Sequence, residues 1–294
     1  MKANKLRSAH LFAITMVIFV VQLFAPHTHA YIPHSQTIIN RIVKSHGKGS
    51  YIVEQDVQFR TSTEPLLLHE RWLVENGESM RVTVTAPSAG KSVDPIRYDA
   101  IYRGGRRTVT DPGSGAKTIA ASPEFIESFF HDRSARGLTN SLIQARILPP
   151  GFLRDRPKLQ KIEQIKYTPE PDLRLGRDAG VVAWIFGQPS PQKGPLNPEA
   201  WVAQDLFSIL KLRFSSEAEV TADRYTTYAG ALKLPRERTV SWDGNSATIR
   251  ITSVRTVATA QLGRQLEPDS LNPLAKNSRL PDLAQVREFY SRFR

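Results

Sequence analysis

Residues 70–84 read ERWLVENGESMRVTV, and this stretch decides the fold class. Met80, Val82 and Val84 alternate with polar residues, which is the period of a strand with one buried face. The pair Asn76-Gly77 before them favours a two-residue hairpin turn, so residues 66–74 are expected to form the partner strand. On that strand Glu70 shares a face with Trp72, and we therefore expect a bulge or an exposed end at Glu70.

The same period of two recurs on both sides of this hairpin. On a strand at residues 51–59, one face would carry Tyr51, Val53, Val57 and Phe59. Further strands are expected at 96–102, 108–110, 161–167, 181–186, 201–202, 209–214, 224–228, 238–242 and 248–254. Consecutive strands at hairpin spacing are typical of a large antiparallel sheet.

Four stretches have helical spacing instead, at about 35–45, 122–131, 136–147 and 281–293. In the second, Ser122-Pro123-Glu124 combines an N-cap residue, a proline at the first helical position and an acid in the first turn. One face of that helix would carry Phe125, Ile126, Phe129 and Phe130. The predicted fold class is therefore α+β, mainly antiparallel β, with a curved or partly closed sheet and helices on one face.

The first thirty residues have the pattern of a signal peptide. Three cations precede an apolar run of about 15 residues, which is short for a membrane-spanning helix of roughly 20. Small residues around Ala30 suit a signal peptidase, so we expect cleavage after Ala30 and a periplasmic location. An uncleaved membrane anchor is the alternative.

The composition limits the chemistry. The sequence has no cysteine, which excludes disulfides, thiolate metal ligands and cysteine nucleophiles. The net charge is +12, but the cations are dispersed and the chain carries an export signal, so we expect no nucleic-acid partner. A solvated basic surface and contact with an anionic membrane surface are the two interpretations of this charge.

No motif for catalysis or for a cofactor stands out. Four histidines follow residue 30, and none forms a His-x-x-x-His pair on a helix. Neither a Gly-x-Ser-x-Gly elbow nor a credible Ser-x-x-Lys motif is present. We therefore predict a protein that is not an enzyme and that holds no metal and no cofactor.

Several segments in a fixed order resemble the LolA/LolB-like superfamily, above all its outer membrane lipoprotein-sorting protein relatives. The resemblance begins with HSQTIINRIV at 34–43, the strand 51–59 and the hairpin 70–84. It continues through WVAQD at 201–205, LPR at 234–236, WDG at 242–244 and the strand 249–254. One departure is that Glu75-Asn76-Gly77 stands where the carriers of this superfamily have an Arg-Pro pair important for ligand exchange.

The resemblance implies an unclosed half-barrel of about eleven antiparallel strands with helices covering its concave face. With the signal-peptide pattern and the Pro/Asn-rich linker that begins near Pro268, we expect three parts: a signal peptide at 1–30, the half-barrel at 31–267, and a linker and helix at 268–294. In the lipoprotein carriers the space between sheet and helices receives acyl chains. The carrier resemblance thus points to a periplasmic carrier or chaperone for an acylated ligand, either a lipid or a lipoprotein.

Large apolar side chains are the candidates for lining such a pocket. The candidates are Tyr51, Val53, Val57, Phe59, Trp72, Val74, Met80, Tyr98, Phe125, Ile126, Phe129, Phe130 and Trp184. The same side chains would equally suit an ordinary core, because aromatic residues dominate cores. A filled core would favour the alternative function, a structural or interaction protein of the bacterial envelope with protein partners there.

Overall fold

The computed structural model describes residues 32–61, 64–75, 79–86, 95–111, 115–153, 170–271 and 279–294. From Pro33 on, the chain forms one compact unit. The predicted signal peptide, the Asn76-Gly77 turn and the strand expected at 161–167 lie outside the described residues. In the described part of the chain, no helix is long and apolar enough to cross a membrane.

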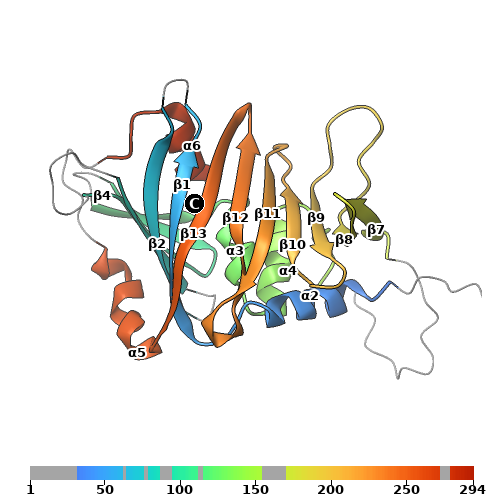
Figure 1. Ribbon diagram of the computed structural model, residues 1–294, viewed down its shortest axis with the longest axis horizontal. Helices are drawn as coiled ribbons and strands as arrows, with labels where there is room; N and C mark the ends of the chain where they lie inside the picture. Colours follow the sequence, from blue (N-terminus) through green and yellow to red (C-terminus); the bar gives the residue numbers. More distant parts are fainter. Residues whose placement is uncertain are drawn as a thin grey trace, which may run out of the picture. The chain divides into compact units, whose positions relative to one another are not determined.

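Thirteen strands form one sheet within these residues (Figure 1). They are β1 (Ser50–Phe59), β2 (Leu66–Glu75), β3 (Ser79–Thr85), β4 (Ile96–Arg103), β5 (Arg106–Asp111), β6 (Gly115–Ala120), β7 (Leu173–Asp178), β8 (Val181–Phe186), β9 (Glu199–Ala203), β10 (Ile209–Arg213), β11 (Glu219–Thr227), β12 (Lys233–Trp242) and β13 (Asn245–Val257).

The strand order is β6-β5-β4-β3-β2-β1-β13-β12-β11-β10-β9-β8-β7, and the neighbours are antiparallel. The sheet is thus two meanders joined where β1 pairs with β13, and its edges β6 and β7 do not pair with each other. The predicted α+β, mainly antiparallel and unclosed fold is confirmed. There are thirteen strands where about eleven were expected, because β6 and β7 extend the two edges.

The α-helices are α2 (Ser35–Lys44), α3 (Glu127–His131), α4 (Ala135–Gln144), α5 (Thr259–Leu262) and α6 (Ala284–Arg292). Helices α3, α4 and α6 lie over one face of the sheet, which we call the inner face (Figure 1). Short 3₁₀ turns occur at Ala229–Ala231, Gly263–Leu266 and Pro268–Ser270. On the opposite face, Leu262 and Leu266 pack against Ile52 and Leu73.

Helix α2 ends where predicted, at the glycines that follow it. Its buried side chains are Ile38, Ile39, Ile42 and Val43. Gly47 has φ +72°, and a Cβ there would lie 2.8 Å from the Cβ of Leu232. Only glycine fits this close approach of two backbones without displacement.

The bulge expected at Glu70 is absent. Strands β1 and β2 keep one register from the pair Ser50 and Glu75 to the pair Phe59 and Leu66. Glu70 therefore points to the inner face with Trp72, and it is only 2% exposed. The strand needs no irregularity there because this carboxylate has buried hydrogen-bond partners.

Helix α3 begins later than predicted. Ser122 is not its N-cap: the Ser122 Oγ accepts the amide of Glu124 at 3.1 Å within a turn that precedes the helix, and no side chain caps the helix itself. The next turn is interrupted because the amide of Ile126 donates to the main-chain oxygen of Phe293 at 3.3 Å. The regular helix therefore starts only at Glu127. We refer to residues 122–131 as the α3 stretch.

Candidate functional site

The thirteen apolar residues predicted to line a pocket are all buried, each with at most 8% of its surface exposed. Twelve of them lie on β1 to β4 or on the α3 stretch. Trp184, on β8, instead contacts the ring of Phe207 at a centroid distance of 4.9 Å. The structure thus places these twelve on β1 to β4 and on the α3 stretch, with Trp184 apart from them.

The α3 stretch meets the sheet through aromatic rings. Phe125 stacks on Tyr102 of β4, with the ring centroids 4.2 Å apart and the planes within 4°. The Phe125 centroid also lies 6.2 Å from that of Trp72 on β2. Phe129 makes an edge contact with Phe214, at 6.0 Å. Such contacts hold the α3 stretch to the inner face.

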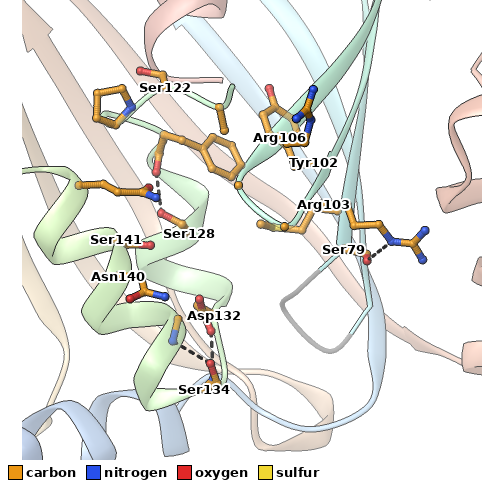
Figure 2. A pocket seen from close by; sticks show the side chains of 18 of the residues that line it. Ser79, Tyr102, Arg103, Arg106, Ser122, Ser128, Asp132, Ser134, Asn140 and Ser141 are labelled. Carbon is orange, nitrogen blue, oxygen red and sulfur yellow. Dashed lines mark hydrogen bonds between the residues drawn. The ribbon is translucent and has the colours of Figure 1, made fainter. Parts of the chain in front are cut away.

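A cavity of about 650 Å³ lies beside this stack, between the β4–β5 turn and the helices α3 and α4 (Figure 2). Met80, Tyr102 and Phe125 supply its apolar wall. Two of these, Met80 and Phe125, are among the predicted pocket residues. A pocket of this volume is in the range that takes up small organic ligands.

The helical side of the cavity is polar. It is formed by Ser128, Asp132, Ser134, Arg136, Gly137, Asn140, Ser141 and Gln144. Ser134 is engaged as the N-cap of α4, where its Oγ accepts the amide of Gly137 at 2.8 Å. In Figure 2, Asn140 and Ser141 lie on one side of the cavity and Tyr102 and Arg106 on the other.

Three arginines and two carboxylates give the rim its charge. The arginines are Arg103, Arg106 and Arg136, and the carboxylates are Glu75 and Asp132. Arg103 is occupied, since it donates to Ser79 Oγ at 3.2 Å and pairs with Glu267 at 3.2 Å. Arg106 and Arg136 are exposed and form no ion pair with any residue that the structure describes. The rim thus carries two solvent-exposed guanidinium groups.

Another part of the inner face is covered by the chain itself. The covering residues belong to the 284–294 segment, which comprises α6 with Phe293 and Arg294. Its Phe289 ring lies 5.2 Å from that of Phe59, its Tyr290 ring 5.3 Å from that of Tyr98, and its Phe293 ring 5.3 Å from that of Trp242. Aromatic side chains thus fill the space that a half-barrel would otherwise leave open.

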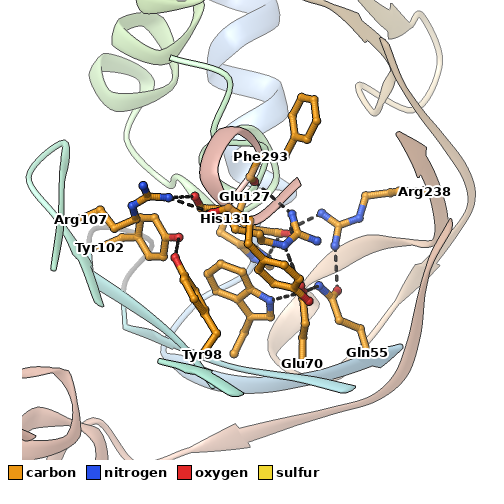
Figure 3. Close-up of polar contacts among 12 residues, drawn as sticks. Gln55, Glu70, Tyr98, Tyr102, Arg107, Glu127, His131, Arg238 and Phe293 are labelled. Carbon is orange, nitrogen blue, oxygen red and sulfur yellow. Dashed lines mark hydrogen bonds and ion pairs between the residues drawn. The ribbon is translucent and has the colours of Figure 1, made fainter. Parts of the chain in front are cut away.

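Beneath this segment lies a buried polar cluster centred on two carboxylates, Glu70 and Glu127 (Figure 3). Arg294 bridges them, with Nε 3.0 Å from Glu70 Oε1 and Nη1 3.1 Å from Glu127 Oε1. Arg238 binds the other Glu127 oxygen at 2.8 Å. Glu70 also accepts from Trp72 Nε1 at 2.9 Å and from Gln55 Nε2 at 2.7 Å.

The four charges of this cluster balance, and none of the four residues is more than 2% exposed. Burial alone would raise the pKa of Glu127, but Arg238 and Arg294 outweigh it and hold that pKa well below its ordinary value. For Arg294, burial opposes the charged form, yet Glu70 and Glu127 raise its pKa. Both groups therefore stay ionised.

Glu127 also begins a short chain of hydrogen-bonding partners. His131 Nε2 lies 3.0 Å from Glu127, and His131 Nδ1 lies 2.7 Å from the Tyr51 hydroxyl. Burial lowers the pKa of His131 despite Glu127, so the ring is neutral. Its Nε2 then donates to the carboxylate and its Nδ1 accepts from Tyr51. Although the order resembles a catalytic triad, the three residues are at most 2% exposed and no substrate can reach them.

Sequence reasoning missed this cluster. Its members are far apart in sequence, from Gln55 to Arg294. Two signals could have indicated it: Glu70 lies on the apolar face of its strand with Trp72, and Glu127 is four residues from His131 on the expected helix. In the described part of the chain, no group of three or more His, Asp or Glu residues could hold a metal ion.

No protein-family model matches the chain, and no curated protein matches it. The structure is similar to that of a LolA superfamily protein from Nitrosomonas europaea, with 10% identity and a TM-score of 0.49 over 79% of this chain and 97% of that one. It is also similar to a DUF1329 family protein from Desulfovibrio piger, with 12% identity and a TM-score of 0.46 over 79% and 97%. A putative outer membrane lipoprotein-sorting protein domain from Vibrio parahaemolyticus has 10% identity and a TM-score of 0.45 over 78% and 96%. At these identities the similarities concern the fold alone.

Proposed function

We propose that this protein is a periplasmic, non-enzymatic carrier or chaperone for an acylated ligand, a lipid or a lipoprotein. The observation that carries the proposal is the cavity of about 650 Å³ between the sheet and the helices. The periplasmic location rests on the signal-peptide pattern of residues 1–30.

The two sides of the cavity suit the two ends of such a ligand. Met80, Tyr102 and Phe125 offer an apolar surface, on which each buried methylene of an acyl chain gains about 0.8 kcal/mol. Arg106 and Arg136 lie at the rim, where an anionic head group would remain near water. A ligand with an apolar chain and an anionic end therefore fits better than a purely polar one.

The absence of a catalytic role is supported by where the titratable groups lie. The Tyr51-His131-Glu127 chain is closed to solvent, so it stabilises the fold and does not act on a ligand. Among the described residues, the cavity lining has serine hydroxyls but no histidine that could act as their base. Binding without chemistry is the function that this lining supports.

The proposal can be tested by filling the cavity. Ser141 is half-buried, lines the cavity and makes no side-chain hydrogen bond with a described residue. We expect Ser141→Trp to weaken the binding of a fluorescent fatty acid at least about tenfold, or about 1.4 kcal/mol, while the melting temperature stays unchanged. The matched control is Thr221→Trp, at an exposed position of β11. Equal binding by the wild type and both variants would contradict the proposed site.

A second function is favoured by the covered inner face. Because the 284–294 segment fills it, the protein also fits a structural or interaction role in the bacterial envelope, with envelope proteins or an anionic membrane surface as partners. This role predicts that the wild type binds no acyl probe. The fluorescent fatty acid therefore separates the two functions before any variant is made.

A further inference from the structure

Three consecutive residues at the end of the 284–294 segment each contact the α3 stretch. Arg292 Nε lies 3.0 Å from Glu124 Oε2. The main-chain oxygen of Phe293 accepts the amide of Ile126 at 3.3 Å, and Arg294 pairs with Glu127 at 3.1 Å. The contacts run in parallel along both stretches, and the one at Ile126 is the contact that interrupts helix α3.

The same residues are held to the sheet on their other side. Arg294 pairs with Glu70 of β2 at 3.0 Å, and its guanidinium carbon lies 5.6 Å from the centroid of the Trp72 ring. Arg107 of β5 donates to the main-chain oxygens of Tyr290 and Ser291 at 3.0 and 3.2 Å. The 284–294 segment therefore bridges the sheet and the α3 stretch.

We infer that the 284–294 segment is a built-in occupant of the inner face that holds the α3 stretch closed and competes with an acyl chain for that face. The inference rests on the proposed function for the identity of the competing ligand. It goes further in naming what keeps the cavity small: the α3 stretch, with Phe125 and Ser128, forms one wall of the cavity.

Physical features of the segment favour its release as a unit. Helix α6 has nine residues, and isolated helices of that length are marginal in water, so its order depends on packing against the inner face. Its release would leave Phe59, Tyr98 and Trp242 without their aromatic neighbours, an apolar surface suited to an acyl chain. With such an occupant, the apparent affinity for the ligand is the intrinsic affinity multiplied by the fraction of molecules in which the face is free.

The test compares three full-length variants. The double variant Arg294→Gln with Glu70→Gln removes one cation and one anion, so the remaining pair of Arg238 and Glu127 stays balanced. Arg292 is partly exposed, and Arg292→Ala removes its ion pairs with Glu124, Asp243 and Glu288. The matched control is Arg287→Gln, on the exposed side of α6, where the ion pair with Asp282 is solvated.

Amide hydrogen exchange reports the closure and a fluorescent fatty acid reports the competition. In the first two variants we expect the amide exchange rate of residues 125–131 to rise about tenfold, which corresponds to an open fraction that increases from about 1% to about 10%. We also expect the probe to bind several-fold more tightly. Exchange in β1 and β2 and the behaviour of Arg287→Gln should match the wild type.

The inference would be overturned if the exchange rate at 125–131 did not change in the double variant and in Arg292→Ala. It would also be overturned if exchange in these variants rose equally in all elements of the protein. Exchange that rises only at 125–131, together with probe affinity equal to that of the wild type, would refute the competition. If no variant and no wild-type protein binds the probe, the proposed function fails, and the exchange result alone then decides whether the segment closes the α3 stretch.

Discussion

The buried cluster and the cavity both adjoin the α3 stretch, yet their arginines differ in what surrounds them. In the cluster, Arg238 and Arg294 are at most 2% exposed and both bind carboxylates. At the cavity rim, Arg106 and Arg136 are exposed and form no ion pair with a described residue. The difference follows from access to water: a charge must be paired where the 284–294 segment excludes water, and it can remain solvated at the open rim.

The largest expected effect on stability is in the buried cluster, which the 284–294 segment covers. Arg294→Ala leaves Glu70 and Glu127 buried with less compensation, and we expect it to lower the free energy of unfolding by about 5 kcal/mol. Arg136→Ala, at the rim, should change it by less than about 0.5 kcal/mol. Denaturant titrations of the two variants measure both values. Similar losses for the two arginines would remove the distinction between the regions.

A slightly smaller loss of stability is expected when a buried aromatic side chain of the α3 stretch is truncated. Phe129 is fully buried, packs against Phe214 and does not line the cavity. Phe129→Ala should therefore cost about 4 kcal/mol, as a cavity in a filled core does. The same variant should leave the binding of a fluorescent fatty acid intact under conditions in which it is folded. A loss of binding with little loss of stability would place Phe129 in the ligand site instead.

Acid should destabilise the fold through its two buried histidines, His46 and His131. Burial lowers the pKa of His46 to about 4, from 6.5 in the unfolded chain, and it also lowers that of His131. The unfolded state then binds more protons between these values, so stability falls as the pH drops from about 6.5 to about 4. For His46 alone the loss is on the order of 3 kcal/mol. In unfolding measured at several pH values, His46→Asn should flatten this dependence; an unchanged slope would exclude His46 as a source.

The comparison also shows what the sequence could predict. Alternation located strands such as residues 51–59 and the hairpin at 70–84, because one face of each is apolar and the other polar. It missed β6, whose residues GAKTIA are mostly exposed on both faces at the sheet edge. It also missed the buried cluster, because a glutamate or arginine in a strand is normally solvated, and here the α3 stretch and the 284–294 segment together cover these positions.

The smallest effect concerns the rim arginines. Arg106→Ala and Arg136→Ala should each weaken the binding of a fatty-acyl carboxylate about threefold to fivefold, or roughly 1 kcal/mol at an exposed site. Binding of the corresponding uncharged acyl amide should not change, and the difference should shrink at high salt. Titrations of both probes at two salt concentrations decide the matter. Equal weakening for both probes would mean that the arginines shape the cavity and do not recognise charge.

The central claim is that the open side of the inner face holds an acylated ligand. Native mass spectrometry of the protein purified from its own envelope tests it most directly, because gentle ionisation preserves a bound lipid. We predict a population heavier than the polypeptide by the mass of an acyl species, which is lost in Ser141→Trp and retained in Thr221→Trp. A wild-type protein found only at the mass of the bare polypeptide would contradict the carrier and favour the envelope interaction protein with a filled core.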